Sequence, residues 1–352
     1  MDRKDLLKLL NDIKEDDMPS LDEGERILII DGLNLFLRNF AVLNYINTDG
    51  VHIGGLGGFL RSLGSLVTQL KPTSIYIVFD GVGSSVNRKN LLPEYKSGRS
   101  GNRINKLSFQ SLEKENESKT DQIIHLIHYL QCLPVNILSQ DGVEADDIIA
   151  FLSKEVTKDK KNKAYIVSAD NDFVQLIDDS ILIYRSVEKE FLTPQLVKQK
   201  YGVHTYNFIL YKTLMGDSSD KVGGVKGLGK KKFDKLFPEV LGEEKLTLDD
   251  IYSICASRFK EHVIYCHALE GFDDLRKAYQ IMDLSNPMLD EQEKDYILGV
   301  SKEPPYELNA AAFLKFYNQD GLGNILKNVD YWIKNIWSPI DRYNKAKHKN
   351  KL

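Results

Sequence analysis

Acidic side chains gather in the segment DGVEADD, at residues 141–147, directly before the apolar run IIAFL. Two interpretations are open for carboxylates at this place. Acidic residues in the first turn of a helix bind free backbone N–H groups and oppose the helix dipole. Alternatively, clustered carboxylate oxygens bind divalent cations. The choice depends on whether other acidic residues of the chain come to the same place.

Further carboxylates follow short apolar runs that are typical of buried strands. RILIID ends in Asp31, IYIVFD ends in Asp80 and AYIVSAD ends in Asp170. The carboxyl ends of parallel strands share one edge of a sheet, and ligands bind at that edge. One aspartate at such a position is commonly a turn residue. Three at equivalent positions predict a shared acidic site.

The motifs DGVEADD, SADNDF and GDSSD extend this acidic set. Nine carboxylates are candidate metal ligands: Asp31, Asp80, Glu144, Asp146, Asp147, Asp170, Asp172, Asp217 and Asp220. So many carboxylates cannot converge without cations, because mutual repulsion raises their pKa values. Hard oxygen ligands select Mg²⁺, for which Mn²⁺ can substitute. Two such ions roughly 4 Å apart suit phosphodiester hydrolysis, in which one activates water and the other stabilises the leaving 3′ oxygen.

Apolar runs alternate with helical stretches in the first half of the chain. The strand-like runs are 26–31, 75–80, 135–138, 164–170 and 181–184, and helical stretches such as 55–70 and 120–131 separate them. This alternation predicts an α/β fold with a twisted parallel sheet flanked by helices. From about residue 190 the sequence is expected to be mostly helical.

These patterns divide the chain into four predicted regions. They are an N-terminal helix and acidic linker at 1–25, an α/β core at 26–190, a helical DNA-binding region at 191–340 and a basic tail at 341–352. No apolar run approaches the roughly 20 residues of a membrane helix. The charged N-terminus does not resemble a signal peptide. We therefore expect a cytoplasmic protein without membrane contact.

Although the net charge of the chain is −4, two segments are locally basic, at residues 84–103 and 221–235. Basic patches of this kind bind phosphate backbones, although a solvated lysine face explains either segment alone equally well. The second segment contains GVKGLGKK, which has lysine where a P-loop has Ser or Thr, and no strand precedes it. We therefore exclude an ATP site. A tight hairpin between helices is expected instead, with phosphate contacts from Gly224, Gly227, Gly229, Lys230 and Lys231.

The ordered set of motifs resembles the 5′-nuclease family, which includes flap endonucleases, the 5′-exonuclease domain of bacterial DNA polymerase I and phage replication nucleases. The resemblance covers residues 26–240, through IIDGLN, VFDG, LLPEYKSGR, GVEADD, SADNDFVQL, GDSSD and GVKGLGKK. The C-terminal stretch is loosely similar to the T-even phage RNase H. The resemblance implies a Mg²⁺-dependent, structure-specific 5′-nuclease that removes RNA primers and 5′ flaps in phage-type DNA replication.

The resemblance also assigns the acidic residues to two metal ions. The first ion is expected on Asp80, Glu144, Asp146 and Asp170, with Asp31 bound through water. The second is expected on Asp172, Asp217 and Asp220, with Asp147 near both. Among these, Asp80, Asp146 and Asp170 are the predicted catalytic carboxylates.

The motif LLPEYKSGR is expected, by the same resemblance, at the base of a flexible arch over residues 84–120 through which a 5′ single strand passes. The implied nucleic-acid contacts of this region are Arg88, Tyr95, Lys96, Arg99 and Arg103. Lys96 and Arg99 are expected to stabilise the scissile phosphate electrostatically. Tyr95 is expected to stack on a base, and an ordinary half-buried tyrosine is the alternative.

The segment 215–237 is expected to be the family's helix–hairpin–helix element, which binds duplex and holds K⁺ through backbone carbonyls. The implied partners are branched or nicked DNA and RNA–DNA duplex. A sliding clamp or single-strand-binding protein is a further candidate, and the chain is expected to be a monomer. Two other functions stay open, a PIN-like endoribonuclease and a non-catalytic protein that binds branched DNA.

Overall fold

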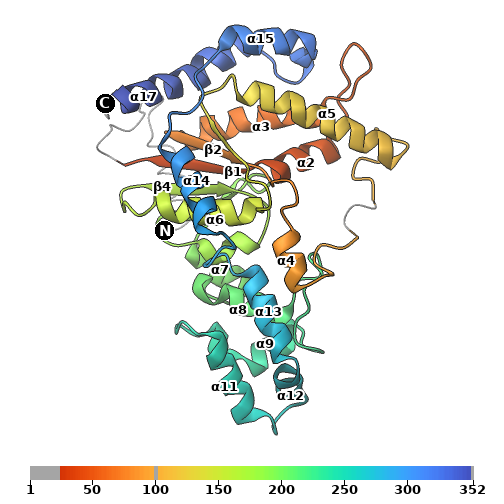
Figure 1. Cartoon of the computed structure of the whole chain (residues 1–352), viewed down its shortest axis with the longest axis vertical. Coiled ribbons are helices and arrows are strands. Elements are labelled where there is room, and N and C mark those ends of the chain that lie inside the picture. The colour runs from red at the N-terminus through yellow and green to blue at the C-terminus, as the bar shows by residue number, and fades with distance from the viewer. Residues whose placement is uncertain (1–23, 99–101, 350–352) are drawn as a thin grey trace.

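The computed structural model of the protein describes residues 24–98 and 102–349 (Figure 1). The predicted N-terminal helix and Arg99 lie outside these residues. The described residues form a six-stranded sheet in the order β3-β2-β1-β4-β5-β6. Its strands are β1 (Arg26–Asp31), β2 (Ser74–Val78), β3 (Asn136–Leu138), β4 (Lys163–Val167), β5 (Ile181–Arg185) and β6 (Glu190–Leu192). The first five are parallel and β6 runs antiparallel to β5, which confirms the predicted α/β fold.

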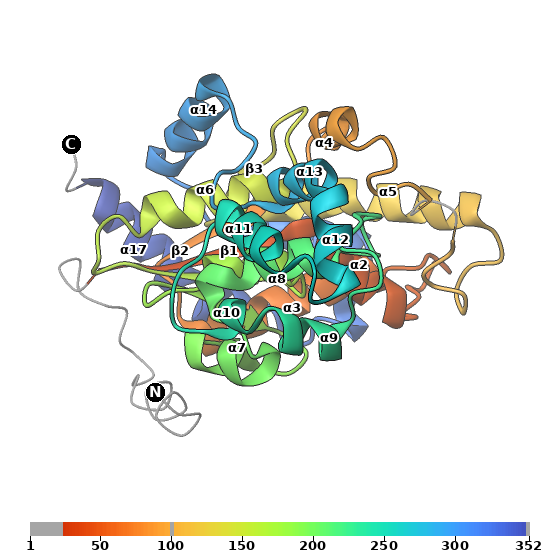
Figure 2. The ribbon, with the colours of Figure 1, turned by 90° about the horizontal axis from the view of Figure 1, so that it is seen from below.

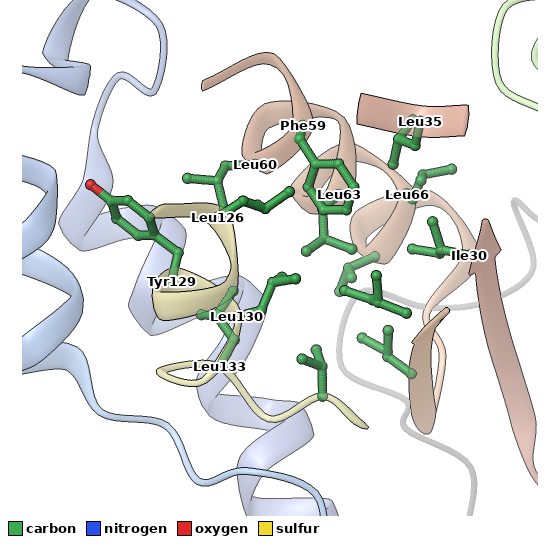
Figure 3. Packing of buried hydrophobic residues seen from close by; sticks show 14 of the residues in the cluster. Ile30, Leu35, Phe59, Leu60, Leu63, Leu66, Leu126, Tyr129, Leu130 and Leu133 are labelled. Atoms are coloured by element: carbon green, nitrogen blue, oxygen red, sulfur yellow. The ribbon is translucent and has the colours of Figure 1, made fainter. Parts of the chain in front are cut away.

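The two faces of the sheet are covered by different helices (Figure 1). Alternate residues of β1 point to opposite faces, as the period of a strand requires. Leu28 and Ile30 join a core with α2 (Gly32–Val42), α3 (Gly54–Leu70) and α5 (Leu112–Leu130), part of which is drawn in Figure 3. Ile27 and Ile29 join a second core with α6 (Ala145–Val156) and the 3₁₀ helix η2 (Asp172–Leu176).

Helix α3 contains several glycines in its first turns, although glycine is a poor helix former. A Cβ atom on Gly55 would lie 2.7 Å from the ring of Phe36, and one on Gly58 would lie 2.5 Å from Leu43. These glycines therefore let α2 and α3 approach closely. The close packing fixes the direction of α2, which starts at the end of β1.

A group of helices lies below the sheet in Figure 1 and has a hydrophobic core of its own. It contains α7 (Pro194–Tyr201), α8 (Phe208–Met215), α9 (Lys230–Leu236), α10 (Pro238–Leu241), α11 (Leu248–Arg258), α12 (Val263–Glu270) and α13 (Phe272–Met282). Seen from below in Figure 2, these helices overlie the middle of the sheet. Helix α13 contacts both α8 and the short helix α4 (Val86–Leu91), so it joins this group to the segment before LLPEYKSGR.

The chain then returns to the opposite face of the sheet. Helix α14 (Glu291–Lys302) leads back along the side of the core to α15 (Ala310–Gln319), α16 (Val329–Trp332) and α17 (Ser338–Lys349) (Figure 1). Phe313 packs against Tyr129 of α5 at a ring distance of 5.0 Å, and a Cβ on Gly64 of α3 would lie 2.1 Å from the indole of Trp332.

The predicted helical region at 191–340 therefore differs in extent from the helices of the structure, and its DNA binding stays a prediction. The sheet continues to Leu192, and the helices after residue 310 belong to the core that covers α3 and α5. The predicted basic tail begins inside α17. Helical periodicity identifies an apolar face but does not say which other element covers it.

None of the helices in the described part of the chain is both long enough and apolar enough to cross a bilayer.

Candidate active site

Three predicted metal ligands lie at the carboxyl ends of neighbouring strands. Asp31 is the last residue of β1, Asp80 follows β2 by two residues and Asp170 follows β4 by three. Because β1 lies between β2 and β4, these carboxylates share one edge of the sheet, as predicted. The strand order reverses between β1 and β4, and such reversals are where parallel sheets bind ligands.

Asp31 both caps a helix and belongs to the shared acidic site, the two roles that its place in the sequence allowed. Its Oδ1 accepts a hydrogen bond from the backbone N–H of Asn34 at 3.0 Å, which caps helix α2. Its Oδ2 accepts one from the Ser168 hydroxyl at 3.1 Å. The same hydroxyl accepts the N–H of Asp170 at 3.0 Å. Ser168 therefore fixes Asp31 relative to Asp170.

Helix α6 brings the DGVEADD segment to this edge. The Asp80 carboxylate accepts the first N–H of the helix, that of Ala145, at 2.8 Å. Asp146 lies in the first turn of the helix, directly after Ala145. Glu144 precedes Ala145 and is the N-cap residue of the helix. The carboxylate that binds the first N–H of this helix thus comes from Asp80, outside the DGVEADD segment, while the N-cap residue Glu144 makes no side-chain cap hydrogen bond and belongs to the crowded acidic residues. We call Asp31, Asp80, Glu144, Asp146 and Asp170 the sheet-edge group.

The crowding has a clear electrostatic effect. Burial raises the pKa of Asp31 to about 7, and the charges of Asp80 and Asp170 add to the rise while hydrogen bonds from Asn34 and Ser168 oppose it. Burial and the charge of Asp170 also raise the pKa of Asp146, against the opposing charge of Lys96. Holding these carboxylates ionised together is therefore costly unless a cation lies among them.

A second acidic group contains Asp172, Asp217 and Asp220, and one carboxylate oxygen of each lies within 4.8 Å of the others. We call it the hairpin group, since two of its members lie in the turn after α8. Asp172 is tied to the sheet-edge group, because its N–H donates to Asp170 Oδ1 at 2.9 Å. The two groups predicted from the sequence are therefore joined by one short loop.

Arg185, which no sequence motif singled out, supports this loop. Its guanidinium donates to the carbonyl oxygens of Ser168 and Asp170 at 2.9 and 3.1 Å, and to Asn171 Oδ1 at 2.9 Å. The side chain is buried at the end of β5. A basic residue ending an apolar strand was the only sequence signal for this role. Arg185 holds the backbone between the two acidic groups.

Lys212 of α8 was also missed, and it lies inside the hairpin group. Its ammonium donates to Asp172 Oδ1 and, at 2.8 Å, to Asp217 Oδ2. Burial opposes the ionisation of Asp217, but hydrogen bonds from Lys212 and Ser219 outweigh it and lower the pKa of Asp217. The sequence signal was a single lysine within the apolar segment FILYKTLM.

Glu144 connects the sheet-edge group to the base of the predicted arch. It accepts hydrogen bonds from the Tyr95 hydroxyl at 3.0 Å and from Lys96 Nζ at 2.9 Å. Tyr95 is only 3% exposed, so its predicted stacking on a base is wrong. Lys96 keeps part of its side chain exposed beside the acidic residues, which is the place that contact with a phosphate requires.

Arg88 and Asp147 are placed differently from the prediction. They form a bidentate ion pair with distances of 2.5 and 3.0 Å, and Arg88 is 4% exposed. Arg88 also donates to the Ile281 carbonyl, and Asp147 accepts the N–H of Met288. The predicted DNA contact of Arg88 is therefore wrong, while Asp147 is paired with Arg88 and its metal contact stays a prediction. The pair joins α4, α6 and the segment after α13.

Three further predicted nucleic-acid contacts can be placed. Arg103 is half-buried and donates to the Phe109 carbonyl at 2.5 Å, within the chain that leads into α5. Lys230, at the start of α9, contacts Asp234 at 2.5 Å and the Tyr201 carbonyl at 3.1 Å, whereas Lys231 is exposed. Of these three described residues, Lys231 is the one that presents its side chain to solvent without such a contact being described.

The predicted hairpin joins α8 to α9. Asp217 and Val222 form an isolated antiparallel bridge, and a Cβ on Gly224 would lie 2.4 Å from the backbone nitrogen of Gly216. Gly227 has a φ of +78°, a conformation that favours glycine. Gly229 is the N-cap residue of α9. A hairpin between two helices is thus present within residues 215–237.

A family model for the 5′-3′ exonuclease N-terminal, resolvase-like domain matches residues 26–202, which is half of the chain. The chain belongs to this family. It is 32% identical over 273 residues to DNA polymerase I of Bacillus subtilis, covering 76% of this chain and 28% of that protein. It is 33% identical over 205 residues to a 5′-3′ exonuclease of Buchnera aphidicola, covering 58% of this chain and 66% of that protein.

A solved structure of bacteriophage T5 flap endonuclease, with DNA and metal ions, is similar to this exonuclease-family chain in fold. The TM-score is 0.59 at 18% identity, and the match covers 85% of this chain and 98% of that one. The predicted 5′-nuclease resemblance and the fold are therefore confirmed. The chain spans little more than a quarter of the Bacillus polymerase that it matches.

The residues of this exonuclease-family chain fit divalent cations on their own chemistry. Both groups offer carboxylate oxygens, which Mg²⁺ and Mn²⁺ prefer. In the sheet-edge group, burial first and the neighbouring carboxylates second raise the pKa values of Asp31 and Asp146, and a bound cation would offset both effects. Glu144, Asp146 and Asp170 are the residues that would hold one ion, with Asp80 and Asp31 beside them. Asp172, Asp217 and Asp220 would hold another.

Proposed function

We propose that this chain is a divalent-metal-dependent, structure-specific 5′-nuclease that hydrolyses phosphodiesters in 5′ flaps, nicked duplexes and RNA primers. The observation that carries the proposal is the joining of two acidic groups by one loop, through the Asp172 N–H and Asp170 Oδ1. A partly exposed lysine, Lys96, lies beside them. Family membership supports the same reaction class.

The chain's own residues divide the work in this proposal. Bound divalent ions supply Lewis acidity, which activates water and stabilises the leaving oxygen. The sheet-edge and hairpin groups hold those ions, while Ser168 and Arg185 keep the loop between them in place. Lys96 offers positive charge to the scissile phosphate from the base of the arch. No protein nucleophile is required.

The hairpin supplies duplex binding in this proposal. Its backbone N–H groups around Gly227 and Gly229 and the exposed Lys231 contact phosphates without reading base sequence. A K⁺ ion held by hairpin carbonyls stays a prediction. Mg²⁺ is the proposed physiological ion, with Mn²⁺ as a substitute, because both match an all-oxygen ligand set.

The setting of the reaction is also a proposal. Family members recorded as a bacterial DNA polymerase I and a 5′-3′ exonuclease suggest primer removal during DNA replication, in a phage or bacterial cytoplasm. The solved T5 flap endonuclease, which binds DNA, supports branched DNA as the substrate. A sliding clamp or single-strand-binding protein is the proposed partner, and a monomer the proposed state.

The test is digestion of 5′-labelled flap, nicked and single-stranded substrates, in DNA and RNA forms, with Mg²⁺ or with EDTA. The proposal predicts short labelled products from flaps and nicks in Mg²⁺ and none in EDTA. Cleavage of single-stranded RNA alone would instead indicate a PIN-like endoribonuclease. Binding of flaps without cleavage under any ion would indicate a non-catalytic DNA-binding protein.

A further inference from the structure

Asn171 lies in the short loop that joins the sheet-edge group to the hairpin group. It is the residue between Asp170 and Asp172, and its side chain is exposed. Its Oδ1 accepts hydrogen bonds from the guanidinium of Arg185 at 2.9 Å and from the hydroxyl of Tyr201 at 3.0 Å. Neither donor belongs to the loop, because Arg185 ends β5 and Tyr201 ends α7. Two separate elements therefore hold this exposed amide.

These two contacts fix the orientation of the amide. A guanidinium has only donors, so the atom of Asn171 that Arg185 contacts must be the oxygen rather than the nitrogen. The hydroxyl of Tyr201 donates to the same oxygen. An amide oxygen has two lone pairs, and the two donors occupy both, so this oxygen is not left for a metal ion. The Nδ2 group, which carries two N–H donors, therefore faces away from both partners.

The place of this donor group suits a phosphate of the substrate. The candidate metal ligands Asp170 and Asp172 flank Asn171 in the chain, so its Nδ2 group lies beside the place where the proposed reaction brings a phosphodiester. Asparagine side chains are ordinary phosphate contacts in protein–DNA complexes. A neutral amide also donates to a phosphate without competing with bound ions for the neighbouring carboxylates. The exposed Lys200, whose ammonium lies 5.6 Å from the centre of the Tyr201 ring, adds positive charge nearby.

We propose that Asn171 binds a non-bridging oxygen of a substrate phosphate next to the scissile one, and that Tyr201 is a positioning residue that orients its amide. The proposal rests on the proposed function, because it assumes that the acidic groups act on a phosphodiester. It gives α7 a role in the reaction, since the last residue of this helix orients a substrate contact in the loop between the two acidic groups. Arg185 contributes to the same orientation from β5.

The experiment is single-turnover cleavage of a 5′ flap by the full chain in Mg²⁺, over a range of enzyme concentrations, which separates half-saturation from the maximal rate. Phosphates on either side of the scissile one, in both strands, are replaced one at a time by an uncharged methylphosphonate. On the unmodified flap, Asn171→Ala should raise the half-saturating concentration about tenfold, as expected for the loss of one hydrogen bond to a charged group. At one position, the methylphosphonate should cost the wild type about tenfold more affinity than it costs Asn171→Ala, which no longer makes the contact.

Two further variants and a control separate the contact from the structure of the loop. Asn171→Asp keeps an oxygen for Arg185 and Tyr201 but replaces the donor by a negatively charged oxygen, so it should lose at least as much affinity as Asn171→Ala. Tyr201→Phe keeps the ring that packs against Phe208 and should lose about threefold, at the same phosphate. Asn335→Ala, at an exposed asparagine after α16, is the matched control and should behave as the wild type.

Equal methylphosphonate losses in the wild type and in Asn171→Ala at every position would overturn the proposal, because a purely structural role does not single out one phosphate. Wild-type half-saturation by Asn171→Asp would also overturn it, and wild-type half-saturation by Tyr201→Phe would overturn the role of Tyr201. If Asn171→Ala does not fold, Asn171→Asp takes its place in the same scan. Failure of the proposed function differs from these results, since the wild-type chain would then not cleave the unmodified flap.

Discussion

In the sheet-edge group, burial and neighbouring carboxylates raise the pKa values of Asp31 and Asp146. In the hairpin group, hydrogen bonds from Lys212 and Ser219 outweigh burial and lower the pKa of Asp217. Both groups contain only carboxylate ligands, yet among the described contacts Lys212 pairs with two of the three hairpin-group members, whereas Lys96 and Arg88 reach the sheet-edge group at Glu144. The comparison shows that the kind of acidic residue does not decide the direction in which the pKa values of a site are shifted. The cations that pack beside the carboxylates help to decide it.

The largest expected effect follows from removing a carboxylate of the sheet-edge group. Asp170→Asn should lower the rate of flap cleavage about a thousandfold or more, since charge stabilisation of the reacting groups is lost. Binding of the flap should survive. Single-turnover cleavage and fluorescence anisotropy measure the two quantities. Asp121→Asn, at an exposed residue of α5, is the control, and full activity of Asp170→Asn would remove this group from the reaction.

Substitution of two adjacent aspartates of α6 should have different effects on stability and on cleavage. Asp147→Asn breaks the buried pair with Arg88 and should lower the free energy of unfolding by about 3–5 kcal/mol. Asp146→Asn removes one of several crowded carboxylates, so it should abolish cleavage while keeping or raising stability. Urea unfolding in EDTA measures both variants. If Asp147→Asn is as stable as the wild type but inactive, Asp147 acts as a metal ligand rather than as a structural partner of Arg88.

The raised pKa of Asp31 also predicts that the stability of the chain depends on pH. Because burial raises the pKa of Asp31 to about 7, the folded chain keeps a proton that the unfolded chain has already released. This residue therefore costs stability as the pH rises from its ordinary pKa of 3.8 to about 7. In EDTA, the melting temperature of the wild type should fall relative to that of Asp31→Asn across this range. A constant difference would show that Asp31 ionises normally.

The smallest effect concerns the base of the arch. Tyr95→Phe removes one hydrogen bond to Glu144 and should cost about 1 kcal/mol of stability. Flap affinity should stay the same, because the ring is buried. Tyr95→Leu separates this account from base stacking. Weaker DNA binding by a folded Tyr95→Leu, without a matching loss of stability, would favour stacking.

The sequence was sufficient to predict the sheet and to predict that distant acidic residues come together. Short apolar runs ending in Asp31, Asp80 and Asp170 could be placed at one edge because parallel strands leave no other arrangement. The rule needs no knowledge of side-chain partners. The lengths of the strands were less predictable, since β2 ends at Val78 and β4 at Val167.

The pairing of cations could not be predicted in the same way. Arg88 meets Asp147 across 59 positions, and Lys212 meets Asp172 across 40. A basic segment looks the same in the sequence whether its arginine is buried against an aspartate or exposed to DNA. The apolar faces of the last helices were equally ambiguous, because α3 and α5 cover them rather than the helices around α8.

The most direct test of the central claim is to locate Mn²⁺ by anomalous diffraction from crystals of the full chain grown with the ion. We predict one peak among Glu144, Asp146 and Asp170 and a second among Asp172, Asp217 and Asp220. Peaks confined to unrelated surface carboxylates, with none in either group, would contradict the account.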